Sequence, residues 1–127
     1  MSQKQLETKT ILIVEDDADI GPILLKVILS ETAYLGVLVD DGIRALDFVR
    51  ATKPALVLLD YLLPRMNGIE VYDKLRQMEA LQQVPILMMS ASAPQKELDK
   101  RKLPLIKKPF DLDELLETID RLLSHIG

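Results

Sequence analysis

The sequence has 127 residues, of which 48% are hydrophobic and 28% charged, which suits one domain with a substantial core. It contains no cysteine and one histidine, His125, so disulfides, zinc–thiolate sites, cysteine nucleophiles and multi-histidine metal sites are excluded. The formal net charge of −4 argues against a nucleic-acid partner, because phosphate backbones are held by an excess of positive charge.

The first nine residues are polar and lack the apolar core of a secretory signal peptide. No apolar run approaches the roughly 20 residues that a helix needs to span a bilayer. We therefore expect a flexible N-terminal segment over residues 1–9 and a single domain over residues 10–127. We also expect a cytoplasmic protein that has no membrane partner.

Five short apolar runs, rich in leucine and β-branched residues, predict β-strands. Four of the runs lack polar alternation, which is typical of strands covered on both faces of a parallel sheet. The second run is less regular and suits an edge strand. The five runs are residues 11–14, 35–39, 55–59, 85–89 and 103–106.

Segments with helical spacing of apolar residues lie between and after these runs. The first contains Pro22, which fits only near the first turn of a helix. Before the last, Asp111 is a candidate cap, with Glu114 three residues later as in a capping box. Residues 94–102 are charged and poorly amphipathic, so we expect a short or irregular fourth helix. The predicted apolar stripes are Ile20, Ile23, Leu24, Val27 and Ile28; Ala45, Leu46 and Val49; Val71, Tyr72, Leu75 and Met78; and Leu112, Leu115, Leu116, Ile119, Leu122, Leu123 and Ile126.

The alternation of strand and helix, repeated five times, predicts a parallel sheet with helices on both faces. Right-handed crossovers then favour an open, doubly wound, three-layer α/β fold. The carboxyl ends of all five strands would lie at one edge of this sheet, where ligands of open α/β sheets bind.

Polar side chains follow four of the predicted strands. They are Glu15, Asp16, Asp17, Asp60, Ser90, Lys107 and Lys108. Clustered carboxylates raise each other's pKa unless a positive group neutralises them, and Mg²⁺ suits such a cluster because it leaves room for phosphate oxygens. Asp60 would act as nucleophile, while the metal, Lys108 and Ser90 each neutralise or orient a phosphoryl oxygen. This set of groups predicts phosphoryl transfer, in which catalysis is mostly positioning and charge stabilisation.

Five stretches, taken together and in order, resemble the response-regulator receiver domains of two-component systems. They are ILIVEDDADI, DDGIRAL, PALVLLDYLLPRMNGIEVYDKLR, PILMMSA and IKKPFDLDELL, and they span about residues 10–126. The resemblance implies a flavodoxin-like sheet of strand order 2-1-3-4-5. It also implies a signalling phosphoacceptor, rather than an enzyme, that assists its own phosphorylation and dephosphorylation. A histidine kinase or histidine phosphotransfer protein would supply the phosphoryl group, with Mg²⁺ or Mn²⁺ bound, and a downstream protein would read the result.

The resemblance assigns roles to the acidic residues. Asp60 is the expected phosphoacceptor and a metal ligand, with Asp16 as a direct ligand and Glu15 acting through water. The backbone carbonyl of Leu62 is a further expected metal ligand. The role of Asp17 is open, and capping of the following helix is the simplest one.

The resemblance also assigns the phosphate-binding groups. Ser90 matches the switch hydroxyl and Lys108 the phosphate-binding lysine, which Pro109, as a cis-proline, would direct into the site. The family often has an aromatic residue three positions before the lysine, whereas this sequence has Leu105. The interval from Ser90 to Lys108 is also short, by about one helical turn. We therefore expect intact chemistry with an altered output surface.

Two other functions remain open. Leu105 and the short fourth unit favour a receiver-like interaction module that phosphate no longer controls, although the acidic cluster speaks against it. An enzyme on a similar fold is the other alternative. An aspartyl-phosphate hydrolase would have a second aspartate at position 62, where this sequence has Leu62, and a flavin carrier would have a phosphate-cradling loop at residues 15–17, where carboxylates repel phosphate.

Overall fold

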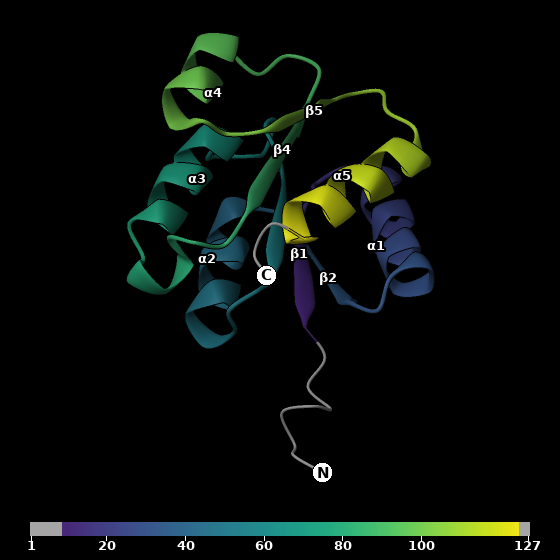
Figure 1. The fold of residues 1–127 in the computed structure, drawn as a ribbon. Coiled ribbons are helices and arrows are strands. Elements are labelled where there is room, and N and C mark those ends of the chain that lie inside the picture. The colour runs from purple at the N-terminus through teal and green to yellow at the C-terminus, as the bar shows by residue number, and fades with distance from the viewer. Residues whose placement is uncertain (1–8, 125–127) are drawn as a thin grey trace.

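The computed structural model describes residues 9–124, which form five repeats of a strand followed by a helix (Figure 1). The strands are β1 (Thr10–Val14), β2 (Leu35–Val39), β3 (Leu56–Asp60), β4 (Ile86–Ser90) and β5 (Leu105–Lys107). The helices are α1 (Ile20–Glu31), α2 (Gly42–Ala51), α3 (Gly68–Arg76), α4 (Gln95–Arg101) and α5 (Leu112–Ser124), and a short 3₁₀ turn, η2 (Glu79–Leu81), precedes β4. The predicted order of elements is confirmed. No helix within residues 9–124 has both the length and the apolar character needed to cross a membrane.

The five strands form one parallel sheet in the order β2-β1-β3-β4-β5. This is the predicted doubly wound, flavodoxin-like arrangement. Strand β2 lies at an edge and is partly exposed, as its less regular sequence predicts, whereas β1, β3 and β4 are buried along their whole length. Strand β3 is central, with hydrogen-bonded neighbours on both sides.

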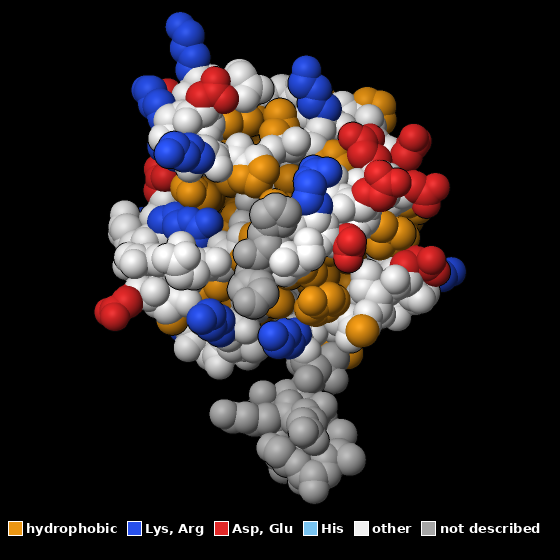
Figure 2. Space-filling model, in the orientation of Figure 1, with side chains coloured by type: hydrophobic (Ala, Val, Ile, Leu, Met, Phe, Trp, Pro, Cys, Tyr) orange, Lys and Arg blue, Asp and Glu red, His pale blue; other side chains and the backbone are white. Residues whose placement is uncertain are grey.

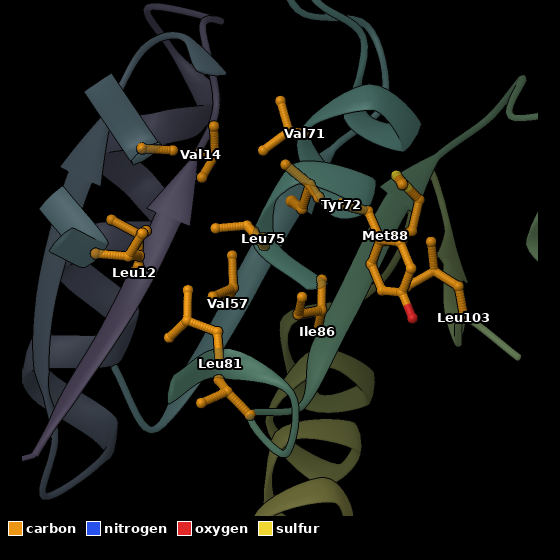
Figure 3. Packing of buried hydrophobic residues seen from close by; sticks show 14 of the residues in the cluster. Leu12, Val14, Val57, Val71, Tyr72, Leu75, Leu81, Ile86, Met88 and Leu103 are labelled. Carbon is orange, nitrogen blue, oxygen red and sulfur yellow. The ribbon is translucent and has the colours of Figure 1, made fainter. Parts of the chain in front are cut away.

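Helices α1 and α5 cover one face of the sheet, and α2, α3 and α4 cover the other (Figure 1). Alternate residues of each buried strand point to opposite faces, which is why an unbroken apolar run can serve two cores. Under α1 and α5 the core includes Ile13, Ile28, Leu58 and Leu115. The core on the other face is seen in Figure 3 and includes Leu12, Val14, Val57, Val71, Leu75 and Met88.

Three details of the predicted pattern were wrong. Ile23 and Leu112 are exposed rather than buried, with exposed fractions of 52% and 40%. In α1 the sheet-facing positions are Leu24 and Ile28, and Ile23 is rotated from Leu24 by about 100° around the helix. Leu112 begins α5, one turn before its first buried residue. The fifth strand begins only after Pro104, which lacks the N–H that a ladder requires. Ile126 lies outside the described residues, as does most of the predicted N-terminal segment.

Helix α4 is short, as predicted, and is attached to α3 by the ion pair of Arg101 with Asp73. The guanidinium group of Arg101 donates to both carboxylate oxygens of Asp73 in α3, at 2.8 Å each. It also donates to the side chain of Glu97 at 3.0 Å. Helix α4 ends at Arg101 and is followed by its C-cap, Lys102, whose φ of 53° is left-handed. A two-pronged Arg–carboxylate pair of this kind fixes the direction as well as the position of the groups that it joins.

Candidate functional site

The pairing of the strands brings the sequence-predicted polar residues to one edge of the sheet. Val14 of β1 pairs with Leu59 of β3, so Glu15 emerges beside Asp60, the last residue of β3. On the next strand, Ser90 ends β4 and pairs with Lys107 of β5. Side chains that are separated by up to 93 positions in the sequence thus become neighbours.

Three carboxylates form the centre of the site. One side-chain oxygen from each of Glu15, Asp16 and Asp60 lies within 4.8 Å of the other two. Glu15 and Asp60 are buried, with exposed fractions of 2% and 5%, whereas Asp16 is exposed. Oxygen ligands at this spacing suit one hard divalent cation, which Asp16 would meet on the solvent side. The carbonyl of Leu62, a residue whose side chain is exposed, stays a predicted ligand.

Lys108 closes the cluster from the β5 side. Its Nζ donates to Glu15 Oε1 at 2.7 Å and to Asp60 Oδ1 at 2.9 Å. Three carboxylates and one ammonium group leave two negative charges in excess, which is the charge of one divalent cation. The residues that are present therefore fit a metal such as Mg²⁺ in chemistry, spacing and charge.

The surroundings shift the pKa values of both Asp60 and Lys108. Burial raises the pKa of Asp60 to about 6, the hydrogen bond from Lys108 opposes this rise, and the charge of Glu15 adds to it. Burial tends to lower the pKa of Lys108, but its hydrogen bonds to Glu15 and Asp60 outweigh burial, and the net change is upward. Lys108 is therefore cationic at neutral pH, while a proton competes with a metal for Asp60 in mildly acidic solution.

The peptide bond between Lys108 and Pro109 is cis, as the resemblance implies. The backbone N–H of Lys108 donates to the carbonyl of Ser90 at 3.1 Å, which extends the pairing of β4 and β5 up to the site. The chain thus leaves β5 with the Lys108 side chain in contact with the acidic cluster.

Ser90 is buried and holds the start of the β4–α4 loop. Its Oγ accepts hydrogen bonds from the backbone N–H groups of Ser92 at 2.9 Å and Ala93 at 2.8 Å. These bonds use the lone pairs of the hydroxyl oxygen and leave its proton free to donate. The role of Ser90 as a phosphate switch stays a prediction, and the structure adds a second role, which is to order this loop.

Asp17, whose role the sequence left open, caps α1. Its Oδ1 accepts from the backbone N–H groups of Asp19 at 2.8 Å and Ile20 at 3.0 Å. These two bonds hold the pKa of Asp17 below its ordinary value, and the bond from Ile20 has the larger effect. Asp17 therefore satisfies the N–H of Ile20, the first residue of α1. Its carboxylate is not one of the three that form the acidic cluster, although its backbone N–H donates to Glu15 Oε2 at 3.2 Å.

Sequence reasoning missed one ion pair near the site. Arg65, in the loop after β3, donates through Nη2 to Asp41 Oδ2 in the loop after β2, at 2.8 Å. The two residues are 24 positions apart and belong to loops, so neither strand periodicity nor helical spacing relates them. The only hint was the DDG stretch before the second helix, where Asp41 is a typical N-cap.

A family model described as the response regulator receiver domain matches residues 11–120. The chain belongs to this family. Like other receiver domains, it is a module of two-component signalling, and its strand order, acidic cluster and lysine follow the family pattern that the sequence indicated.

The proteins that this chain resembles include both a small response regulator and a large histidine kinase. It is 29% identical to the polar-differentiation response regulator DivK of Brucella ovis, over 94% of this chain and 98% of the relative. It is 30% identical to hybrid signal transduction histidine kinase D of Dictyostelium discoideum over 97% of this chain, but it spans only 8% of that kinase. Among solved structures, it resembles the receiver domain of sensor histidine kinase PA1611 from Pseudomonas aeruginosa, which has a magnesium ion coordinated in its active-site cleft. That match has a TM-score of 0.79, 26% identity, and coverage of 93% of this chain and 99% of the other.

Proposed function

We propose that this receiver domain accepts a phosphoryl group on Asp60, with Mg²⁺ or Mn²⁺ bound at the acidic cluster. The observation that carries the proposal is the contact of the Lys108 ammonium group with Asp60 at 2.9 Å, inside a cluster whose charge matches one divalent cation. The magnesium-bound receiver domain of the Pseudomonas kinase supports the choice of metal.

The reaction is a transfer between two anions, which repel each other until their charge is neutralised. A carboxylate oxygen of Asp60 attacks phosphorus, and the bond from phosphorus to the donor nitrogen breaks. The product is an acyl phosphate, and the donor imidazole takes up a proton from solvent. A divalent cation at the cluster supplies charge neutralisation to the phosphoryl oxygens. Lys108 adds a second positive charge, and the hydroxyl proton of Ser90 is available to a phosphoryl oxygen.

We assign the donor to phosphohistidine on a sensor histidine kinase or a histidine phosphotransfer protein. A mostly apolar cleft of about 340 Å³ adjoins Lys108 and is lined in part by Ile23, Phe110 and Leu112. Exposed apolar side chains beside a charged reaction centre favour a macromolecular donor over a small one. The histidine kinases among the relatives support the same assignment.

We further propose that the phosphoryl group changes the binding of a downstream protein, and that the chain acts as a signalling acceptor rather than as an enzyme with a separate substrate. The face that carries α4, β5 and α5 is unequal in charge: Figure 2 shows mainly Lys and Arg side chains, with some acidic ones, over α4, mainly Asp and Glu side chains over α5, and hydrophobic side chains between them. A protein partner with the opposite arrangement of charge fits this face. Nothing in the acidic composition favours a nucleic acid.

Incubation with acetyl phosphate and Mg²⁺, followed by intact mass measurement, tests the proposal. We expect one added phosphoryl group on the wild type, none on Asp60→Ala, and one on the control Asp120→Ala, which removes an exposed carboxylate of α5. EDTA should prevent the addition. A phosphoryl group that persists on Asp60→Ala would place the acceptor elsewhere.

An interaction module that is independent of phosphate is the second candidate. Leu105 in place of an aromatic residue and the attachment of α4 to α3 by Arg101 favour it. Partner binding that is equal with and without a phosphate mimic would select this candidate, even if Asp60 is phosphorylated.

A further inference from the structure

Arg65 adopts a backbone conformation that its residue type rarely adopts. Its φ is 67°, in the left-handed region that glycine enters freely and other residues enter at a cost. It lies in the loop that joins β3 to α3, five residues after Asp60. Such strain persists where the surrounding structure imposes it, and it is often found at functional sites. The contacts of the Arg65 side chain indicate what imposes it here.

The partner of Arg65 is a fixed point of the fold. Asp41 is buried, and its Oδ1 caps α2 by accepting from the backbone N–H of Arg44 at 2.7 Å. Its second oxygen, Oδ2, accepts from Arg65 at 2.8 Å. Oδ1 thus serves α2, whereas Oδ2 bonds to the loop after β3 and also lies 3.9 Å from Nε of Arg44 in α2. The side chain of Arg65 is 72% exposed, whereas that of Asp41 is 10% exposed, so an exposed residue is tied to a buried one.

The sheet order gives this ion pair its position. Because β1 lies between β2 and β3, the loops that follow β2 and β3 flank the end of β1, where Glu15 and Asp16 emerge. The start of α2 also packs against α3 and the loop before it: a Cβ atom placed on Gly42 would lie 2.6 Å from Val71 in α3 and 3.4 Å from Met66 in the loop. Arg65 and Asp41 therefore join the two segments that border the acidic cluster on the α2 and α3 side.

The loop that Arg65 holds is short and directly follows Asp60. The carbonyl of Tyr61 accepts from the N–H groups of Leu63 at 3.1 Å and Gly68 at 2.8 Å, and Met66 N–H donates to Pro64 at 2.7 Å. These bonds all lie within residues 61–68 and shape the loop. Its start is held to β4 by the bond from Tyr61 N–H to the carbonyl of Met89 at 3.2 Å, and Leu63 and Met66 pack against the core. The ion pair to Asp41 adds a polar link from the exposed part of the loop to the segment after β2.

We propose that Arg65 is a positioning residue, whose ion pair with Asp41 holds the β3–α3 loop in the arrangement that the acidic cluster needs to bind a divalent cation. The inference rests on the proposed function for the identity of the ligand, and on the ion pair alone for the position of the loop. An exposed arginine that only solubilises the surface would not require a left-handed backbone. Glycine at position 65 would form the same turn without strain, so the side chain is the feature that distinguishes arginine here.

The test uses three variants and one matched control. Arg65→Gly keeps the turn and removes the ion pair, and Asp41→Asn keeps an oxygen to cap α2 while removing the charge. The third variant carries both substitutions. The control is Lys102→Gly, which removes a positive charge at the C-cap of α4, the other non-glycine residue within residues 9–124 that has a left-handed φ. Calorimetric titration with Mg²⁺ measures affinity, and amide hydrogen exchange without metal measures the order of residues 61–67.

We expect Arg65→Gly and Asp41→Asn each to weaken Mg²⁺ binding by about fivefold, the loss expected for an ion pair that is partly exposed. Each should also speed amide exchange across residues 61–67. The double variant should be no weaker than either single variant, because both remove the same interaction. Lys102→Gly should match the wild type in both measurements.

Unchanged Mg²⁺ affinity together with unchanged loop exchange in Arg65→Gly would overturn the inference. So would fully additive losses in the double variant, because the two residues would then act separately. If the wild type itself binds no Mg²⁺ at millimolar concentration, the proposed function fails and the metal half of the inference fails with it. The exchange comparison would still decide whether the ion pair orders the loop.

Discussion

The surroundings of Asp60 shift its pKa in opposing directions. Burial and the nearby charge of Glu15 disfavour the carboxylate, the hydrogen bond from Lys108 favours it, and the net pKa is about 6 against an ordinary value of 3.8. A carboxyl whose pKa is higher in the folded than in the unfolded state stabilises the fold at pH values below its unfolded-state pKa. This stabilisation is lost as the pH rises through its folded-state pKa. Without metal, the fold is therefore less stable at neutral pH than it would be with a neutral group at this position.

Asp60→Asn should raise the free energy of unfolding in EDTA at pH 7.5 by about 1–2 kcal/mol, which is less than the full shift implies because Lys108 also loses a partner. The gain should shrink as the pH falls through about 6 and disappear by about pH 3, below the ordinary pKa of 3.8, where the wild-type carboxyl is mostly protonated in both states. Urea unfolding at the two pH values measures this. The exposed carboxylate of Asp120 provides the control, since Asp120→Asn should change little. A variant that is less stable than the wild type at pH 7.5 would contradict the argument.

The strand-end rule predicted most of the site residues, for a physical reason. Parallel strands end at one edge, so polar residues that follow buried runs must meet there, as Glu15, Asp60 and Lys108 do. The same rule cannot predict a contact between two loops. The conformation of Arg65 depends on where Asp41 lies in three dimensions, which the sequence pattern does not encode.

At the scale of elements, α4 is held at both of its ends. Ser90 Oγ binds the N–H groups of Ser92 and Ala93 just before the helix, and Arg101 binds Asp73 of α3 in its last turn. With seven residues, α4 has less than two turns between these attachments. A displacement at Ser90 therefore acts on a helix that α3 restrains.

We predict that a phosphate mimic changes amide exchange across residues 94–105 only slightly in the wild type, because the pairing of Arg101 with Asp73 keeps α4 in place. Arg101→Ala should enlarge the change in this segment and lower the free energy of unfolding by about 1 kcal/mol. Arg50→Ala removes an exposed ion pair within α2 and serves as the control. A large response in the wild type would mean that neither Leu105 nor the ion pair limits the movement of α4.

The buried side of each element was harder to predict than the order of the elements along the chain. The buried strands were recognisable because unbroken apolar runs of four or five residues are typical of a parallel sheet. The exposure of Ile23 was not, because α1 is apolar on more than one side, so the sequence does not mark which side faces the sheet. Helix α5, with acidic residues opposite its apolar stripe, presented no such ambiguity.

For the molecule as a whole, a cation that binds only the folded state should stabilise it. At a free Mg²⁺ concentration of ten times the dissociation constant, the gain is about 1.4 kcal/mol, or about 5 °C in Tm for a domain of this size. The effect should shrink as the pH falls through about 6, because a proton then occupies Asp60. Thermal unfolding in MgCl₂ and in NaCl of equal ionic strength separates specific binding from screening. Equal Tm values in the two salts at pH 7.5 would contradict the metal site.

The overall topology was predictable because few chain paths satisfy the rules at once. Right-handed crossovers and burial of three strands on both faces leave little freedom once the strands and helices are placed. The family resemblance supplied the strand order, and the structure confirms it.

The central place of β3 gives the molecule an internal reference. The backbone of Val57, Leu58 and Leu59 is paired with β1 on one side and β4 on the other, and all three side chains are buried. Their amide protons can reach water only when the whole domain opens, so their exchange rate reports global unfolding. The exchange rates of loop amides can therefore be compared with those of these three amides. A loop amide that exchanges faster does so through local opening, and one that exchanges at the same rate does so through global unfolding.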